Sequence, residues 1–162
     1  MIVVADAGPI HYLILTEAIE VLKPLYQRVV VPRMVAEELN RAAAPAEVRN
    51  WLSQPPDWFE VRPDPHTAVW LDHLDPGERV AITLALSLRA DRLLIDDWEG
   101  RVEAERRHLI VTGTLGVLAE AHQRQLLDFE ESFARLSRTG FYFSSPIVEL
   151  VRRRLYPQKK EP

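Results

Sequence analysis

Apolar residues occur along the chain in two kinds of pattern. Short continuous apolar runs are typical of strands that are buried on both faces of a parallel sheet. Such runs predict strands over 2–5, 93–95 and 109–111, and the mostly apolar segments 28–31 and 58–61 predict two more. Between the runs, apolar residues recur at helical spacing. This spacing predicts helices over about 10–15, 16–25, 32–43, 45–53, 67–73, 75–89, 98–107, 113–124, 128–136 and 145–155. The alternation of strands and helices indicates an α/β layered fold with a mainly parallel sheet.

Proline and capping residues set several of the predicted boundaries. The sequence Ala7-Gly8-Pro9 is expected to interrupt the apolar run of the first strand, with Pro9 starting a helix. Thr16 is expected to cap the helix that follows. Pro32 is expected to open a helix directly after the second strand.

Composition narrows the class of protein. The chain has 162 residues, of which 47% are apolar and none is cysteine, and its formal net charge is −4. This length suits one domain, and the absence of cysteine excludes disulfides, thiolate metal sites and thiol nucleophiles. No apolar run reaches the roughly 20 residues that span a bilayer, and no secretory signal is evident. We therefore expect a soluble cytoplasmic protein with one domain over 1–156 and a flexible tail over 157–162.

Acidic residues follow two of the predicted strands. Asp6 ends the first apolar run, and Asp96 and Asp97 end the fourth. An isolated aspartate after a strand is most often a turn former or a helix cap. In parallel sheets, however, ligands bind beyond the carboxyl ends of the strands, so these acids are also candidates for chemistry.

Two glutamates are predicted to face inward from helices. At 100° per residue, Glu38 lies on the shoulder of the apolar stripe of its helix, whereas Glu37 points to solvent. Glu78 lies within the apolar arc of the helix that begins at Pro76, in the first turn, where the helix dipole favours an anion. Its alternative interpretation is an N-terminal helix acid without a partner.

Four buried acidic positions without cationic partners would repel one another and lose hydration. A divalent cation resolves this conflict, and oxygen ligands favour Mg²⁺ or Mn²⁺. Zinc is disfavoured because cysteine is absent and the five histidines lack the HExxH spacing. If the acids converge, at least one carboxyl pKa is expected to be raised in the metal-free protein.

Other α/β classes with clustered acids fit less well. A phosphoacceptor receiver domain needs its acid pair after the first strand and a lysine late in the fold, but no lysine occurs between Lys23 and Lys159. A phosphatase of the haloacid dehalogenase type needs DxDx[TV] after the first strand, where this chain has ADAGP.

The chain resembles the PIN-domain nucleases, and more narrowly their toxin-related, VapC-like branch, over about residues 1–155. The resemblance is carried by VVADAGPIHYL, VPRMVAEEL, LDPGERVAITLAL, LLIDDWEGRVEAERR, LIVTGTLGVLAEA and FYFSSPIVELVRR, in that order. It implies a three-layer α/β/α domain with a twisted sheet and an acidic groove. It also implies metal-dependent ribonuclease activity, often in a toxin that an antitoxin protein restrains.

The resemblance also assigns roles by position. It places Asp6 as the first-strand acid, Glu38 in the second motif and Glu78 as the third acid, at the start of a helix. The fourth acid is Asp96 or Asp97, and the alignment leaves the choice open. Many members have Ser or Thr beside an Asp at this point, so the Asp96-Asp97 pair departs from their pattern.

Arginines and the end of the chain supply further candidates. Arg101, one helical turn after Asp97, is a possible phosphate contact, with a salt bridge as the alternative. Arg106, Arg107 and Arg152–Arg154 are weaker candidates, since a run of arginines is usually a solvated helix face. Apolar residues over 141–155 favour a homodimer, unless they fold back on their own domain. A non-catalytic binding module on the same fold remains the alternative to the nuclease.

Overall fold

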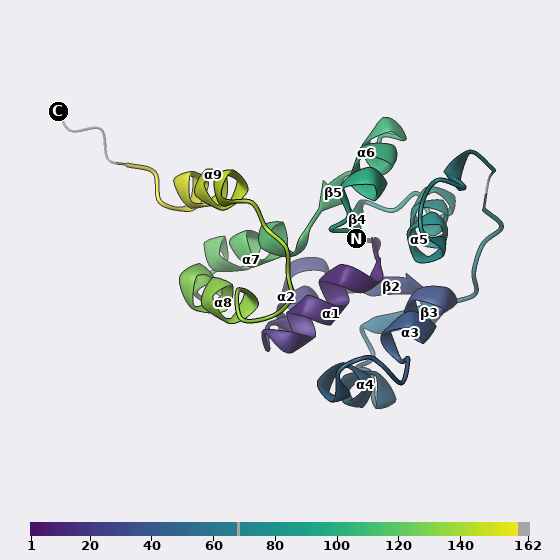
Figure 1. Cartoon of the computed structure of the whole chain (residues 1–162), viewed down its shortest axis with the longest axis horizontal. Helices are drawn as coiled ribbons and strands as arrows, with labels where there is room; N and C mark the ends of the chain where they lie inside the picture. Colours follow the sequence, from purple (N-terminus) through teal and green to yellow (C-terminus); the bar gives the residue numbers. More distant parts are fainter. Residues whose placement is uncertain (68, 159–162) are drawn as a thin grey trace.

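Five parallel strands form the central sheet of the computed structural model, which describes residues 1–67 and 69–158. The strands are β1 (Val3–Ala5), β2 (Val29–Pro32), β3 (Phe59–Arg62), β4 (Arg92–Leu94) and β5 (Val111–Thr112). Their order across the sheet is β3-β2-β1-β4-β5, so the first strand lies at the centre (Figure 1). The parallel α/β fold that the alternating pattern predicts is confirmed.

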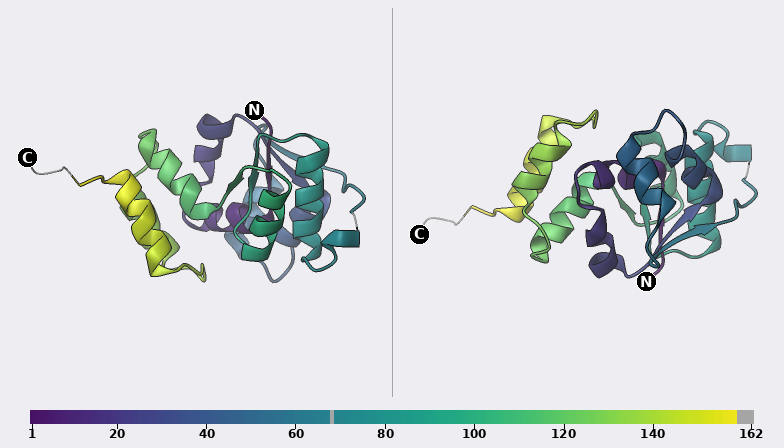
Figure 2. Two further views of the ribbon diagram at one scale, coloured as in Figure 1. Left: turned by 90° about the horizontal axis from the view of Figure 1, so that it is seen from above. Right: turned by 90° about the horizontal axis from the view of Figure 1, so that it is seen from below.

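Helices cover both faces of the sheet. They are α1 (Ala7–Leu15), α2 (Leu22–Tyr26), α3 (Arg33–Leu39), α4 (Ala46–Ser53), α5 (Pro76–Ser87), α6 (Trp98–Arg106), α7 (Thr114–Gln123), α8 (Phe129–Leu136) and α9 (Ser145–Leu155). Short 3₁₀ helices occur at η1 (Ile19–Val21) and η2 (Val69–Leu71). Figure 2 shows these layers from two opposite sides.

Alternate residues of each strand supply the two halves of the core. Val3 and Ala5 face a cluster built with α1, α2, α3 and α7, whereas Val4 faces a second cluster built with α5 and α6. This alternation follows from the two-residue period of a strand. The central strands β2, β1 and β4 are therefore buried on both faces almost throughout, as apolar runs predict, whereas the edge strands β3 and β5 are only partly buried.

The first helix begins earlier than the sequence analysis predicts. It starts at Ala7, so Gly8 and Pro9 lie within its first turn and do not form an irregular segment before the helix. Proline is tolerated there because the first amides of a helix have no partner within the helix. Asp6 is therefore the single residue between β1 and α1, and both elements fix the position of its backbone.

Three other predicted helices differ from the structure. Thr16 ends α1, and its hydroxyl donates to the Tyr12 carbonyl, so the chain over 16–25 forms a turn, η1 and α2 in place of one helix. The third helix stops at Leu39 and not near residue 43. The helix predicted over 67–73 is the short η2, and its residue 68 lies outside the described residues.

The C-terminal helices pack against one another beside the sheet (Figures 1 and 2). Val148 of α9 is buried, and Phe141, Phe143, Val151 and Leu155 pack against the core. Much of the apolar surface over 141–155 therefore folds back on its own domain. In the predicted tail, 159–162 lie outside the described residues. No helix in the described part of the chain has the length and apolar character needed to cross a bilayer.

Candidate active site

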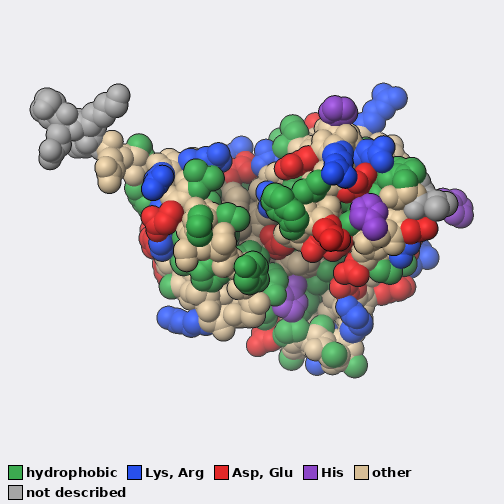
Figure 3. Space-filling view, turned by 45° about the horizontal axis from the view of Figure 1, so that its top comes forward, with side chains coloured by type: hydrophobic (Ala, Val, Ile, Leu, Met, Phe, Trp, Pro, Cys, Tyr) green, Lys and Arg blue, Asp and Glu red, His purple; other side chains and the backbone are tan. Residues whose placement is uncertain are grey.

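The predicted acidic residues lie together at the carboxyl edge of the sheet. Asp6 follows β1, Asp96 and Asp97 follow β4, Glu38 lies in α3, and Glu78 lies in the first turn of α5. Figure 3 shows acidic side chains gathered beside the hollow in the middle of this face of the molecule. Elements that are far apart in sequence thus bring five carboxylates to one region.

Three glycines mark where these carboxylates approach the backbone. A methyl carbon built on Gly77 would lie 2.9 Å from Glu38 Oε2 and 3.6 Å from Asp6 Oδ1. The same carbon on Gly100 would lie 3.6 Å from Glu78 Oε2, and on Gly8 it would lie 3.2 Å from Asp96 Oδ2. A side chain at Gly77 or Gly8 would crowd a carboxylate oxygen, whereas at Gly100 the nearest atom is Ile95 Cδ1 at 2.6 Å and the Glu78 oxygen lies at ordinary contact distance.

Asp6 is the most enclosed of the acids. The residue is 8% exposed. Burial is the main cause that raises the pKa of its carboxyl group to about 7, and the charges of Glu38, Asp96 and Asp97 raise it further. The Ala7 amide opposes the rise. Asp6 therefore has three acidic neighbours, and no cationic side chain of the described residues lowers its pKa.

Glu78 is buried to the same extent as Asp6. It is also 8% exposed. Burial raises the pKa of its carboxyl group to about 8, and the charges of Asp97, Asp6 and Asp75 add to the rise. The inward orientation that the helical angles predict for this residue agrees with its burial.

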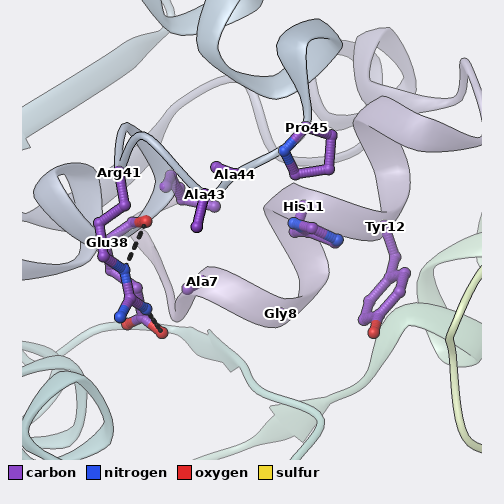
Figure 4. Close-up of a pocket in the computed structure, with 10 residues that line it drawn as sticks. Ala7, Gly8, His11, Tyr12, Glu38, Arg41, Ala43, Ala44 and Pro45 are labelled. Atoms are coloured by element: carbon purple, nitrogen blue, oxygen red, sulfur yellow. Dashed lines mark hydrogen bonds and ion pairs between the residues drawn. The ribbon is translucent and has the colours of Figure 1, made fainter.

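Glu38 is half-buried, whereas its neighbour Glu37 is exposed, as their helical angles predict. The carboxylate of Glu38 pairs with the Arg41 guanidinium at 3.0 Å, and Arg41 Nε also donates to the Glu38 carbonyl at 3.2 Å (Figure 4). The Glu38 carboxylate is thus close both to Asp6, beside Gly77, and to the guanidinium of Arg41.

The two adjacent aspartates have different partners. Asp96 accepts hydrogen bonds from the amide and the hydroxyl of Thr114. Burial raises its pKa, and these hydrogen bonds and the charge of Arg101 oppose the rise. Asp97 is exposed and caps α6 by accepting from the Gly100 amide at 3.0 Å. Asp97 thus fills the capping role that a strand-end aspartate often has, while its charge still raises the pKa of Glu78.

The carboxylates are close together but are not arranged around one point. Within residues 1–67 and 69–158, no three His, Asp or Glu side chains form a group that could hold a metal ion as they stand. Three of the carboxylates already have partners, since Glu38 pairs with Arg41, Asp96 accepts from Thr114 and Asp97 accepts from the Gly100 amide.

The candidate arginines divide into two groups. Arg101 lies beside the site, because the methyl carbon on Gly113 would meet its Nη1 at 2.6 Å and Asp96 Oδ1 at 2.9 Å. By contrast, Arg106 and Arg107 pair with the buried Glu103, at 3.7 and 3.0 Å. In the C-terminal run, Arg152 pairs with Glu130 and Glu149.

Sequence reasoning missed two residues that shape the site. Thr114 fixes Asp96, and Asp75 adds to the negative charge around Glu78. The pattern LDPGE places an acid three residues before Glu78, which is one helical turn, so Asp75 could have been found from spacing. Nothing local in the sequence links Thr114 to Asp96, since they are 18 residues apart.

A pocket of about 450 Å³ adjoins the acids (Figure 4). It lies between α1, the end of α3 and the connection to α4. Its walls are Ala7, Gly8, His11, Tyr12, Glu38, Leu39, Arg41, Ala43, Ala44 and Pro45. Burial lowers the pKa of the His11 imidazole, which favours its neutral form.

Comparison with known proteins relates this architecture to a family. A family model described as a PIN domain matches residues 2–156. Among solved structures, the chain is similar to a PilT N-terminus domain protein from the hyperthermophilic archaeon Sulfolobus solfataricus P2, with a TM-score of 0.51 and 16% identity. The match covers 89% of this chain and 100% of the other, and at this identity it shows the fold alone. No curated protein matches the chain.

Proposed function

The chain belongs to the PIN-domain family, whose members are typically nucleases, and from this premise we propose that it is a metal-dependent endoribonuclease. The proposed substrate is RNA, the reaction is hydrolysis of phosphodiester bonds, and the proposed cofactor is Mg²⁺ or Mn²⁺. The proposed domain covers residues 1–156. The observation that carries the proposal is the convergence of acids from β1, β4, α3 and α5 on three glycines at the carboxyl edge of the sheet.

The donor chemistry fits a hard divalent cation. The site offers carboxylate oxygens, which Mg²⁺ and Mn²⁺ prefer. The raised pKa values of about 7 for Asp6 and 8 for Glu78 arise mainly from burial, and neighbouring carboxylates add to them, so ionising both groups calls for a compensating positive charge. A cation would supply the missing charge, and burial would strengthen the attraction.

We assign the metal-binding role to Asp6, Glu38, Glu78 and the Asp96-Asp97 pair. A divalent cation held there supplies an activated water and stabilises negative charge on the phosphate oxygens. Asp6 is central because its carboxylate influences, or is influenced by, each of the other four. Thr114 orients Asp96, and Arg101 stands beside it where a phosphate oxygen could accept from its guanidinium.

Metal binding and RNA cleavage test this proposal together. Calorimetry should show uptake of Mn²⁺ by the native protein, and single-stranded RNA should be cleaved only when metal is present. Asp6→Asn and Glu78→Gln should each lower the cleavage rate by several orders of magnitude, because the metal carries charge in the transition state. Glu37→Gln is the matched control, since Glu37 is an exposed glutamate next to Glu38. Absence of Mn²⁺ uptake at millimolar concentration would contradict the proposal.

We also propose that the enzyme is the toxin of a toxin–antitoxin pair and acts in the cytoplasm. The resemblance of its motifs to the toxin-related branch supports this assignment. Induced synthesis of the native protein should arrest growth of a bacterial host, whereas Asp6→Asn protein at the same level should not. Equal growth of both cultures would count against a toxin.

A non-catalytic binding module is the second candidate. It is favoured by one observation, which is that the described side chains do not already surround a cation site. In that case the protein would bind RNA or another protein with the same affinity in Mg²⁺ and in chelator. A dependence of RNA binding or cleavage on metal excludes this alternative.

A homodimer through α9 is a further proposal. Ile147 and Leu150 are each 51% exposed on this helix, although most of their apolar neighbours pack inward. Sedimentation at tens of micromolar should give twice the chain mass of 18.6 kDa, and Ile147→Glu should return the protein to the chain mass. A native mass of 18.6 kDa would remove the dimer.

A further inference from the structure

The pocket beside the acids shares two residues with them. Glu38 lines the pocket and lies across Gly77 from Asp6. Gly8 also lines the pocket, and a methyl carbon built on it would lie 3.2 Å from Asp96 Oδ2. A ligand with one end at the carboxylates could therefore extend into the pocket without crossing a wall.

The walls of the pocket combine flat rings with small apolar side chains. His11 and Tyr12 come from α1, with ring centroids 4.7 Å apart and planes 76° from parallel. The Tyr12 ring also packs edge-on against Phe141 at 5.0 Å, which fixes its position. Across the pocket stand Ala44 and Pro45, and Figure 4 shows the His11 ring on their side of α1.

These walls suit a flat, uncharged, polar ring. Aromatic and imidazole faces stack on nucleobases, and this contact tolerates any of the four bases. The neutral His11 imidazole presents one hydrogen-bond donor and one acceptor, and the Tyr12 hydroxyl can do either. Glu38 and Arg41 both line the pocket and pair with each other at 3.0 Å, so a neutral base can lie beside them while its phosphate lies on the far side of the sugar.

We propose that this pocket is the subsite for a nucleobase of the RNA substrate, next to the phosphate that is held at the acids. The His11 ring is its stacking surface, Tyr12 borders it with a ring plane 76° from that of His11, and Ala44 and Pro45 line the other side. The inference rests on the proposed function, because it places the phosphate at the carboxylate cluster. It adds the element that binds the base, and it makes His11 a positioning residue.

Mononucleotides test the subsite without cleavage, because they contain no phosphodiester bond. Binding of AMP, GMP, CMP, UMP and ribose 5-phosphate would be measured by NMR in Mg²⁺, with the His11 ring signals identified by their loss in His11→Ala. At least one mononucleotide should bind about ten-fold more tightly than ribose 5-phosphate and shift the His11 signals. Equal affinity of all five ligands would overturn the proposal.

Variants then locate the preference in the pocket. His11→Ala should lower the affinity for the preferred mononucleotide to that for ribose 5-phosphate, and leave ribose 5-phosphate binding unchanged. Tyr12→Phe, which keeps the ring on Phe141, should retain most of the preference. His66→Ala is the control, because His66 is exposed and does not line the pocket. Unchanged mononucleotide affinity in His11→Ala would contradict the assignment.

A second arm separates this proposal from the metal site. The unphosphorylated nucleosides and ribose would be titrated in chelator, where only the base can distinguish them. Nucleosides should shift the His11 signals and ribose should not. If Mg²⁺ is not taken up but the nucleosides bind at His11, the metal proposal fails and the base subsite stands. If Mg²⁺ is taken up but neither nucleosides nor nucleotides bind better than the matching sugar, the metal proposal stands and the base subsite fails.

Discussion

Thr114 binds both carboxylate oxygens of Asp96. Its backbone amide donates to Oδ1 and its hydroxyl donates to Oδ2, each at 2.7 Å, and Thr114 is completely buried. Through these bonds the first residue of α7 fixes an acid that follows β4. The adjacent Asp97 has no such tie and caps α6. Two neighbouring acids are therefore held by different elements, Asp96 by the start of α7 and Asp97 by the start of α6.

Replacing Thr114 tests whether Asp96 is a metal ligand. Thr114→Val removes the hydroxyl and keeps the shape, so we expect Mn²⁺ affinity to fall by about ten-fold, since partners that orient ligands commonly have effects of this size. The free energy of unfolding should fall by about 1–3 kcal/mol, because a buried carboxylate loses a donor. Thr114→Ser should restore both quantities. Native metal affinity in Thr114→Val would assign the ligand role to Asp97.

The metal-free protein should lose stability as pH rises towards 8. Folding raises the pKa of Asp6 from 3.8 to about 7, so between these values the folded state keeps a proton that the unfolded state has lost. This contribution is fully present below pH 3.8 and is lost as pH rises to about 7, and Glu78 extends the loss to about pH 8. Melting temperatures in chelator should therefore decline over this range.

The same linkage predicts the behaviour of Asp6→Asn. The amide cannot ionise, so the variant should equal or exceed the native melting temperature at pH 8 and lose this advantage near pH 4. Mn²⁺ should stabilise the native protein and have little effect on the variant. A variant that melts several degrees below the native protein at pH 8 would show that Asp6 is needed as a structural cap.

Gly77→Ala should separate metal binding from stability without changing any charge. The new methyl group would lie 2.9 Å from Glu38 Oε2, at the flexible end of that side chain, so the fold can accommodate it by rotating Glu38. Alanine is also a better helix former than glycine by up to about 1 kcal/mol. We expect an unchanged or higher melting temperature together with a clear loss of Mn²⁺ affinity. Gly140→Ala is the control, because no heavy atom lies within 4 Å of its added carbon.

Arg41 is predicted to compete with the metal for Glu38. The pair is partly exposed, with side-chain exposures of 66% for Arg41 and 40% for Glu38, so it is worth at most about 1 kcal/mol. Arg41→Gln should therefore tighten Mg²⁺ binding by up to about five-fold in calorimetry. Arg49→Gln changes the net charge equally, and Arg49 does not line the pocket. An equal gain in both variants would show a general charge effect, not competition at Glu38.

Much of the fold follows from patterns within single segments. Each predicted strand exists within about two residues, because runs such as Ile2–Ala5 are apolar on both faces and only a buried strand satisfies them. Helix ends were less predictable. The third helix ends at Leu39 although Ala42 and Ala43 continue its apolar pattern, and nothing local in the sequence forces that stop.

Patterns within single segments also identify some of the acids of the site. Periodicity separates Glu38 from Glu37, and the ends of apolar runs point to Asp6. The partners of these acids could not be found, because they depend on tertiary contacts. Thr114 meets Asp96 only after β4 and β5 pair, and the pairing of Arg41 with Glu38 depends on where α3 stops.

The position of β1 between β2 and β4 has a consequence for how the protein matures. Asp6 is translated well before Arg92–Leu94, and its strand cannot gain its second neighbour until that segment has been synthesised and pairs with Val3–Ala5. Such long-range parallel pairing forms slowly compared with local contacts. A nascent chain that ends within α5 already contains Asp6, Glu38 and Glu78 but lacks the β4 edge that completes their surroundings. The surroundings of the acidic cluster are therefore completed only after β4 has been translated.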